Sequence, residues 1–197
     1  MDWHALLAIA SGIVGVGSVI PYVRDILYGT TRPNAVSVFL WIVLLIISLA
    51  AQFSAGISWS AAVLVASMFN MLLILGLCLF GYGYRKYGAL DGVCFILAIV
   101  GIILWQLAHE PLIAITFALL ADFISTVPTL AKTARYPETE DPLAWFLIAF
   151  AALLSIAAAN KFTAANLLWP VYYVVIDLTV FGLAFFGRRL KTNSGGT

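Results

Sequence analysis

The chain has few charged residues and few cysteines, and both shortages exclude common classes of protein. Asp, Glu, Lys and Arg make up 10% of its 197 residues, whereas soluble domains contain about 25%. A net charge of +1 gives no reason to expect a nucleic-acid partner. The two cysteines, Cys78 and Cys94, lie inside apolar segments, so we expect neither a disulfide framework nor a metal site.

Catalytic motifs are missing as well. The sequence contains no nucleophile elbow, no phosphate-binding loop and no paired-cysteine motif. His4 and His109 have no partner at a metal-ligating spacing. No run alternates apolar and polar residues with a period of two, which argues against a transmembrane barrel. We therefore expect a protein that is not an enzyme and that holds no cofactor.

Long apolar segments are what the chain has in abundance, and its mean hydropathy is +1.06. A membrane-spanning helix needs about 20 predominantly apolar residues. Seven segments fit, at about 4–27, 35–54, 59–82, 91–108, 111–133, 142–160 and 164–187. The sequence therefore predicts an all-α integral membrane protein with seven transmembrane helices.

Basic residues are distributed unevenly between the two ends of these helices. Of the ten Lys and Arg residues, only Lys161 falls in a loop on the side of the N-terminus. Short loops rich in Lys and Arg stay in the cytoplasm, which places the N-terminus outside and the C-terminus inside. The N-terminus lacks the basic region of a removable signal peptide. We expect a multi-pass protein of a cell membrane, specifically a bacterial inner membrane.

The two halves of the chain share three landmarks under a gap-free shift of 107 residues. The matched pairs are Pro21 with Pro128, Asn34 with Asp141, and Asn70 with Asp177. Asn34 and Asp141 are good helix N-caps, and Pro142 suits a first helical position. The shift predicts two three-helix repeats in the same orientation. The expected division is listed here in chain order: a first repeat at 1–88, a linker helix at 89–109, a second repeat at 110–190 and a disordered tail at 191–197.

Pro21 and Pro128 stand inside the first helix of each predicted repeat. An interior proline removes a backbone hydrogen bond and kinks the helix, and neighbouring helices repair that loss in membrane proteins. Two interpretations stay open. The kinks are either fixed bends that improve packing, or a matched pair of hinges that open and close the cytoplasmic side.

Three polar side chains fall near the middle of apolar segments: Asn70, Asp122 and Asp177. A carboxylate at a helix centre costs roughly 2.5–3.5 kcal/mol on insertion scales. No Lys or Arg lies at a similar depth, so such a group either takes up a proton or requires a cation or a polar solute. The structural alternative is that each one hydrogen-bonds a neighbouring helix.

Other polar and aromatic residues recur at helical spacing around these three. Ser125, Thr126 and Thr129 follow Asp122 along one helix face. We expect a central pocket whose substrate-binding residues are Asn70, Asp177, Asp122, Tyr173, Ser125 and Ser67. Trp3, Trp59 and Trp169 fit an aromatic belt at the membrane interface instead.

A charged pair between two cytoplasmic loops is a further hypothesis. Arg32 in the first such loop can meet Glu138 or Glu140 in the loop before the sixth helix, which would form a cytoplasmic gate. Exposed ion pairs contribute only about 0–1 kcal/mol, so the gate would open easily. Ordinary solvated loop charges explain the same residues.

Two three-helix units in one orientation, joined by an odd fourth helix, resemble the parallel repeats of the SWEET and PQ-loop superfamily over about residues 5–188. The resemblance implies gating at Pro21 and Pro128, substrate contacts at Asn70 and Asp177, and proton coupling through acidic residues of the second half. Tyr22 and Thr129 replace the family's glutamine after each proline. The segments 20–25 and 31–34 look like an uncharacterised bacterial subgroup.

These observations lead to two functional hypotheses. The first is a SWEET-like transporter that moves a small polar solute by alternating access, with or without proton coupling. The second is a non-transporting seven-helix receptor, or an accessory subunit of a larger membrane complex. The expected partners are a small-molecule solute and the lipid bilayer, and association into a homo-oligomer or a larger membrane complex stays open.

Overall fold

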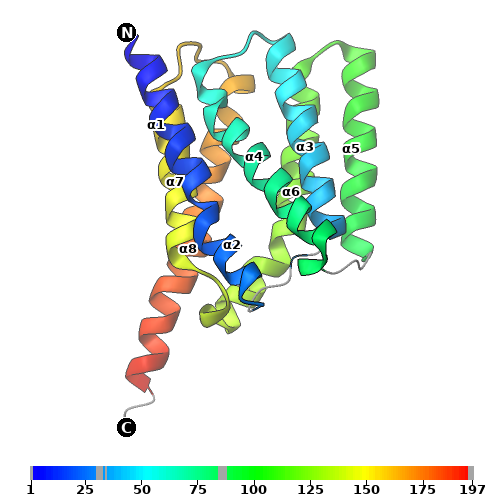
Figure 1. Cartoon of the computed structure of the whole chain (residues 1–197). Helices are drawn as coiled ribbons and strands as arrows, with labels where there is room; N and C mark the ends of the chain where they lie inside the picture. Colours follow the sequence, from blue (N-terminus) through cyan, green and yellow to red (C-terminus); the bar gives the residue numbers. More distant parts are fainter. Residues whose placement is uncertain (1, 30–32, 34, 84–87, 195–197) are drawn as a thin grey trace.

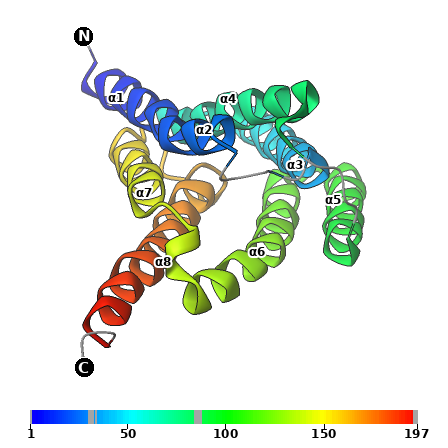
Figure 2. The same ribbon diagram turned by 60° about the horizontal axis from the view of Figure 1, so that its bottom comes forward.

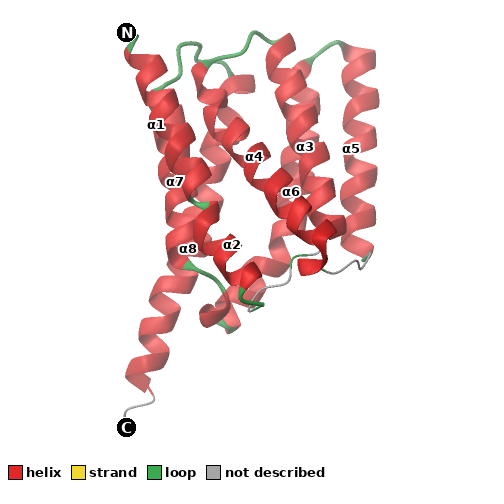
Figure 3. Cartoon of the chain, in the orientation of Figure 1, coloured by secondary structure: helices red, strands yellow, loops and turns green. Residues whose placement is uncertain are grey.

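The computed structural model describes residues 2–29, 33, 35–83 and 88–194, without the side chains of residues 90, 91, 128, 132, 139 and 191–194. The described part of the chain is helical and contains no strand (Figure 3). This confirms the all-helical class that the apolar segments predicted.

Eight α-helices and three short helical turns make up this part of the chain. In order they are α1 (Trp3–Gly17), α2 (Val19–Leu27), α3 (Ala35–Ser54), η1 (Trp59–Ala61), α4 (Ala62–Leu77), η2 (Cys78–Tyr82), α5 (Ala89–Ala108), α6 (Pro111–Arg135), η3 (Pro137–Thr139), α7 (Pro142–Ala157) and α8 (Ala164–Ser194). We call the end of the bundle where the N-terminus lies the upper end, and the end where the C-terminus lies the lower end (Figure 1).

Five helical stretches of the described chain are long and apolar enough to cross a membrane. They are Trp3–Leu27, Ala35–Ser54, Trp59–Tyr82, Pro111–Arg135 and Ala164–Leu190, and two shorter apolar helices are Gly92–Ala108 and Pro142–Ala157. Large apolar side chains also cover the outside, with Ile13 at 69% and Phe80 at 85% exposure. Such a surface suits lipid rather than water, and the fold is that of a multi-pass helical membrane protein.

Six helical segments form a ring, and α5 lies outside it. Helix α1 packs on α4 and α7, helix α3 packs on α4 and α6, and α8 packs on α6 and α7. Helix α5 packs against the outer side of α6 and touches α3 (Figure 2).

The first membrane-length helix is interrupted at Ser18, between α1 and α2. Pro21 has no N–H to donate to the Gly17 carbonyl, and its ring crowds that carbonyl. The interruption therefore falls where the proline predicts it. The Ser18 hydroxyl donates a hydrogen bond of 2.6 Å to the Gly15 carbonyl. This carbonyl, close to the break, therefore has a side-chain partner.

A second interior proline, Pro170, is accommodated without interrupting α8. The carbonyl that Pro170 leaves without a helical donor belongs to Asn166. The Ser60 hydroxyl of η1 donates to that carbonyl at 3.0 Å. A neighbouring element thus repairs the lost bond, as membrane helices require.

Helices α1 and α4 approach closely at Gly15. A Cβ atom added to Gly15 would lie 2.8 Å from the Cβ of Ala66 and 3.5 Å from the Cβ of Ala151. Small residues allow the backbones of membrane helices to pack together in this way. Gly15 therefore sets the distance between α1 and α4.

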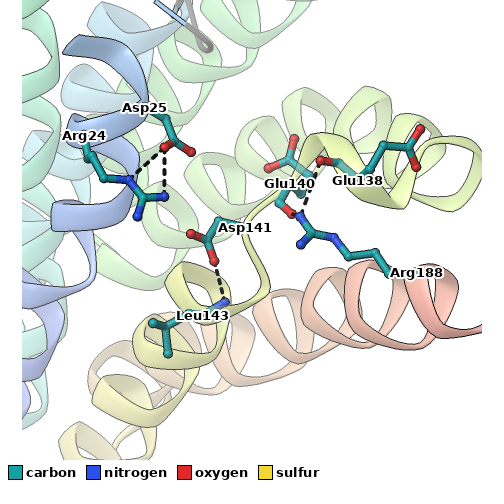
Figure 4. A network of polar contacts seen from close by, with 7 residues as sticks. All are labelled: Arg24, Asp25, Glu138, Glu140, Asp141, Leu143 and Arg188. Atoms are coloured by element: carbon teal, nitrogen blue, oxygen red, sulfur yellow. Dashed lines mark hydrogen bonds and ion pairs between the residues drawn. The ribbon is translucent and has the colours of Figure 1, made fainter. Parts of the chain in front are cut away.

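The lower end is organised by polar contacts to the segment before α7 (Figure 4). Asp141 caps α7, since its Oδ1 accepts from the Leu143 N–H at 2.8 Å, and this confirms its predicted role. Arg188 of α8 donates to the Pro137 carbonyl at 3.1 Å and also to the Glu140 carbonyl. Asn34, the matched landmark of the first half, lies outside the described residues.

Two helix ends differ from the sequence expectation. Helix α7 ends at Ala157 instead of near residue 160, because the chain turns there to reach α8. Helix α8 continues to Ser194, so its backbone extends into the segment expected to form a disordered tail.

Substitution of Gly15 tests the close approach of α1 and α4. We expect Gly15→Ala to lower the free energy of unfolding by about 1–3 kcal/mol, because the new methyl group overpacks against Ala66. Gly12→Ala is the matched control, since a Cβ there meets nothing within 4 Å. Thermal unfolding in detergent measures both, and equal losses for the two variants would contradict the assignment.

Candidate functional site

Asn70 lies about half way along the Trp59–Tyr82 span and is 3% exposed. Its Nδ2 donates to the Gly15 carbonyl at 2.9 Å and lies 3.4 Å from the Ser18 hydroxyl. Its Oδ1 is buried and has no hydrogen-bond partner. The amide nitrogen is therefore hydrogen-bonded beside the break between α1 and α2, while the amide oxygen has no partner.

Asp177 occupies a comparable position in α8 and is also 3% exposed. Its Oδ2 is buried and has no hydrogen-bond partner. Asp177 and Asn70 thus face the protein interior rather than lipid, and they stand on helices that contact one another.

Asp122 of α6 is held by a residue that the sequence argument had not included in the site. The Tyr172 hydroxyl of α8 donates a hydrogen bond of 2.6 Å to Asp122 Oδ2. Asp122 also lies close enough to Asp177 for the two carboxyl groups to interact electrostatically. Neither carboxyl group forms an ion pair with a described basic residue. The signal for Tyr172 was its place beside Tyr173 in an apolar helix.

Tyr173 of α8 lies near α4. Its hydroxyl group is within electrostatic range of Ser67, one turn before Asn70, and of Asp122 and Asp177. The structure therefore brings three of the predicted residues near Tyr173, and Asn70 follows Ser67 by one turn along α4.

Ser125 serves a different purpose in this arrangement. Its hydroxyl accepts from the indole N–H of Trp41 at 2.8 Å and donates to the Asp122 carbonyl at 2.7 Å. The hydroxyl of Thr126 also donates to that carbonyl. The polar stripe of α6 thus bonds largely to its own backbone and to α3, so little of it is left to contact a ligand.

Trp169 was expected at the membrane interface, and that expectation is wrong. Trp169 is 1% exposed and packs edge-on against Tyr172 and Tyr173, at ring-centroid distances of 5.8 and 5.3 Å. Its Nε1 has no partner. Trp3 and Trp59 are 56% and 44% exposed and fit the interface better.

Two buried amides nearer the upper end were not identified from the sequence. Gln52 in α3 is fully buried, and neither its Nε2 nor its Oε1 has a partner. Asn166 donates to the Gly56 carbonyl at 3.2 Å but leaves its own Oδ1 unpartnered. The available signal for Gln52 was an uncharged amide in an otherwise apolar run.

The predicted hinge and gate residues that the structure describes fall in the lower half. Pro21 lies in α2, three residues after the break, and Pro128 lies in the continuous helix α6, where only its backbone is described. Arg32 lies outside the described residues. Glu140 Oε2 accepts from the Trp145 indole at 3.1 Å, and Glu138 is exposed.

No three His, Cys, Asp or Glu side chains gather at a metal-binding spacing in the part of the chain that was searched. The site is thus an uncharged amide, two carboxyl groups and two tyrosines on α4, α6 and α8. Comparison of the chain with protein-family models, with curated proteins and with solved structures finds no match.

Proposed function

We propose that this protein is a seven-span membrane transporter that moves a small polar solute by alternating access. The solute binds half way through the bilayer, between α4 and α8. The observation that carries the proposal is the pair of buried, unpartnered oxygens, Asn70 Oδ1 and Asp177 Oδ2.

Neither of these two oxygens has a hydrogen-bond partner within the described chain. A buried polar atom without a hydrogen bond costs about 1–3 kcal/mol, and hydrocarbon supplies no substitute. A solute with hydroxyl or cationic groups satisfies both oxygens at once. Asp177 also becomes a donor when it is protonated, so Asp177 and Asp122 supply a means of proton coupling.

The packing partners support two parallel repeats. In the proposed repeats, α1, α3 and α4 of the first half correspond to α6, α7 and α8 of the second half. The contact of α1 with α4 then corresponds to that of α6 with α8, and the contact of α3 with α4 to that of α7 with α8. The contact of α1 with α7 likewise corresponds to that of α6 with α3. In this arrangement α5 is the linker helix, and Asn70 and Asp177 are equivalent residues of the two repeats.

Hydrogen bonds between the two halves of the chain hold the upper end closed. The Ser58 hydroxyl donates to Asn160 Oδ1 at 2.9 Å and accepts from the backbone N–H of Asn160 at 3.1 Å. Asn166 bonds Gly56, and His4 Nδ1 lies 3.1 Å from the Ala158 carbonyl. With the N-terminus outside, these bonds form an extracellular gate that separates when the solute enters.

Asn70 links the solute to the hinge. Its Nδ2 is bonded to Gly15 at the break ahead of Pro21, and its Oδ1 is available to the solute. A hydrogen bond that draws the amide toward the solute also pulls on the backbone of α1. Binding and helix bending thus share one side chain.

Transport by purified protein in liposomes tests the site. We expect uptake of one member of a panel of sugars, amino acids, polyamines and vitamins. Asn70→Ala and Asp177→Asn should each lower its rate roughly ten- to hundredfold, because each removes a buried polar contact of about 1–3 kcal/mol. Gln106→Ala and Asp25→Asn are matched controls at positions away from the site. Binding of a solute without flux would favour the non-transporting receptor, and unchanged rates would refute the site.

Loss of Ser58 should open the upper end. In a chain with Cys78 and Cys94 replaced by Ala, Gln52→Cys reports access to the interior through its rate of reaction with a membrane-impermeant maleimide. We expect Ser58→Ala to raise that rate, since it removes hydrogen bonds to Asn160 and to the Lys161 backbone.

Ser54→Ala is the control for this measurement, because the Ser54 hydroxyl bonds only the Ala51 carbonyl of its own helix. An equal effect of Ser54→Ala, or no effect of Ser58→Ala, would mean that these bonds do not hold the gate.

A further inference from the structure

A groove of about 770 Å³ opens on the outside of the bundle between α1 and α4, in the upper half. It is separate from the buried residues of the proposed solute site, which do not line it. Six of its lining residues define its shape: Ala8, Ile9 and Gly12 on α1, and Ala62, Val65 and Phe69 on α4. Nearly all of this lining is apolar.

The groove exists because small side chains line it above a point of close contact. Helices α1 and α4 touch at Gly15 and Ala66. Above that point Gly12 contributes no side chain, and a Cβ added there would meet no atom within 4 Å. The groove is therefore open space that no side chain of the described protein fills.

The mouth of the groove faces the region that lipid occupies. Ile9, Val65 and Phe69 on its walls are 55%, 56% and 53% exposed. The stretch of α4 from residue 62 to residue 69 is about 10 Å long, which corresponds to a substantial part of one leaflet. An acyl chain lying along the helices matches this shape and polarity.

The upper end of the groove is polar and carries a cation. Ser58, Asn160 and Lys161 line it there, together with the half-exposed Trp59. Lys161 pairs with no acidic residue of the described chain. The other Lys and Arg side chains that the structure describes lie toward the lower ends of α2, α6 and α8: Arg24, Arg135, Arg188 and Arg189. Trp59 marks the depth of the membrane interface, where lipid phosphates lie.

We propose that this groove binds an anionic phospholipid of the leaflet at the upper end. One acyl chain lies between α1 and α4, and the phosphate contacts the Lys161 ammonium. Charge complementarity selects the anionic headgroup, and the space left by Gly12 accepts the chain. This assignment is independent of whether the protein transports a solute.

Native mass spectrometry of the full chain tests the proposal. The purified protein is mixed with equal amounts of phosphatidylglycerol and phosphatidylcholine that carry the same acyl chains. We expect the wild type to retain phosphatidylglycerol preferentially. Lys161→Gln should lower the ratio of bound phosphatidylglycerol to phosphatidylcholine about fivefold, the factor for one basic residue near an anionic surface. Gly12→Leu should reduce retention of both lipids, because its side chain fills the groove.

Matched controls identify the groove as the site. Arg135→Gln removes an exposed cation at the lower end, and Gly76→Leu adds the same bulk to α4 where a Cβ meets nothing within 4 Å. Lys161 is exposed, so its replacement tests the headgroup contact even if Gly12→Leu fails to fold. Equal lipid ratios for Lys161→Gln and Arg135→Gln would overturn the proposal. Equal retention by folded Gly12→Leu and Gly76→Leu would overturn it as well.

Discussion

The hydrogen bond from the Asn70 amide to the Gly15 carbonyl is the interaction on which the arrangement of the first four helices depends. It requires Gly15, because any side chain there would push α4 away. It lies beside the break that Pro21 imposes on the first span. In hydrocarbon, backbone carbonyls have no water to bond, and here the Asn70 amide of a neighbouring helix bonds a carbonyl three residues before the break.

The same rule explains features at the opposite end of the molecule. Pro170 frees the Asn166 carbonyl, and the Ser60 hydroxyl bonds it. Asn70 bonds a carbonyl near the break before Pro21, and Ser60 bonds the carbonyl that Pro170 frees. These bonds connect elements that are distant in sequence, while the oxygens of Asn70, Asn166 and Asp177 lie inside the bundle without hydrogen-bond partners.

Much of the helical layout could be predicted from the sequence, because apolar length alone locates helices that cross a membrane. The cap at Asp141 and the interior position of Asn70 followed from side-chain chemistry. The burial of Trp169 and Gln52 did not, because a helix that is apolar all round carries no periodic signal for its inner face. The hydrogen bond of Tyr172 could not be predicted for a related reason: its partner Asp122 is fifty residues away, and only tertiary packing brings the two together.

Helix α8 runs unbroken from the interior carboxyl group to the lower rim. The distance along the helix from Asp177 to Arg188 is about 16 Å. Arg188 donates hydrogen bonds to carbonyls of the segment before α7. A continuous helix is stiff along its axis, so any axial displacement at Asp177 would also displace the hydrogen bonds of Arg188 at the lower end. One rigid element thus connects a carboxyl group buried in the bundle to the polar segment before α7.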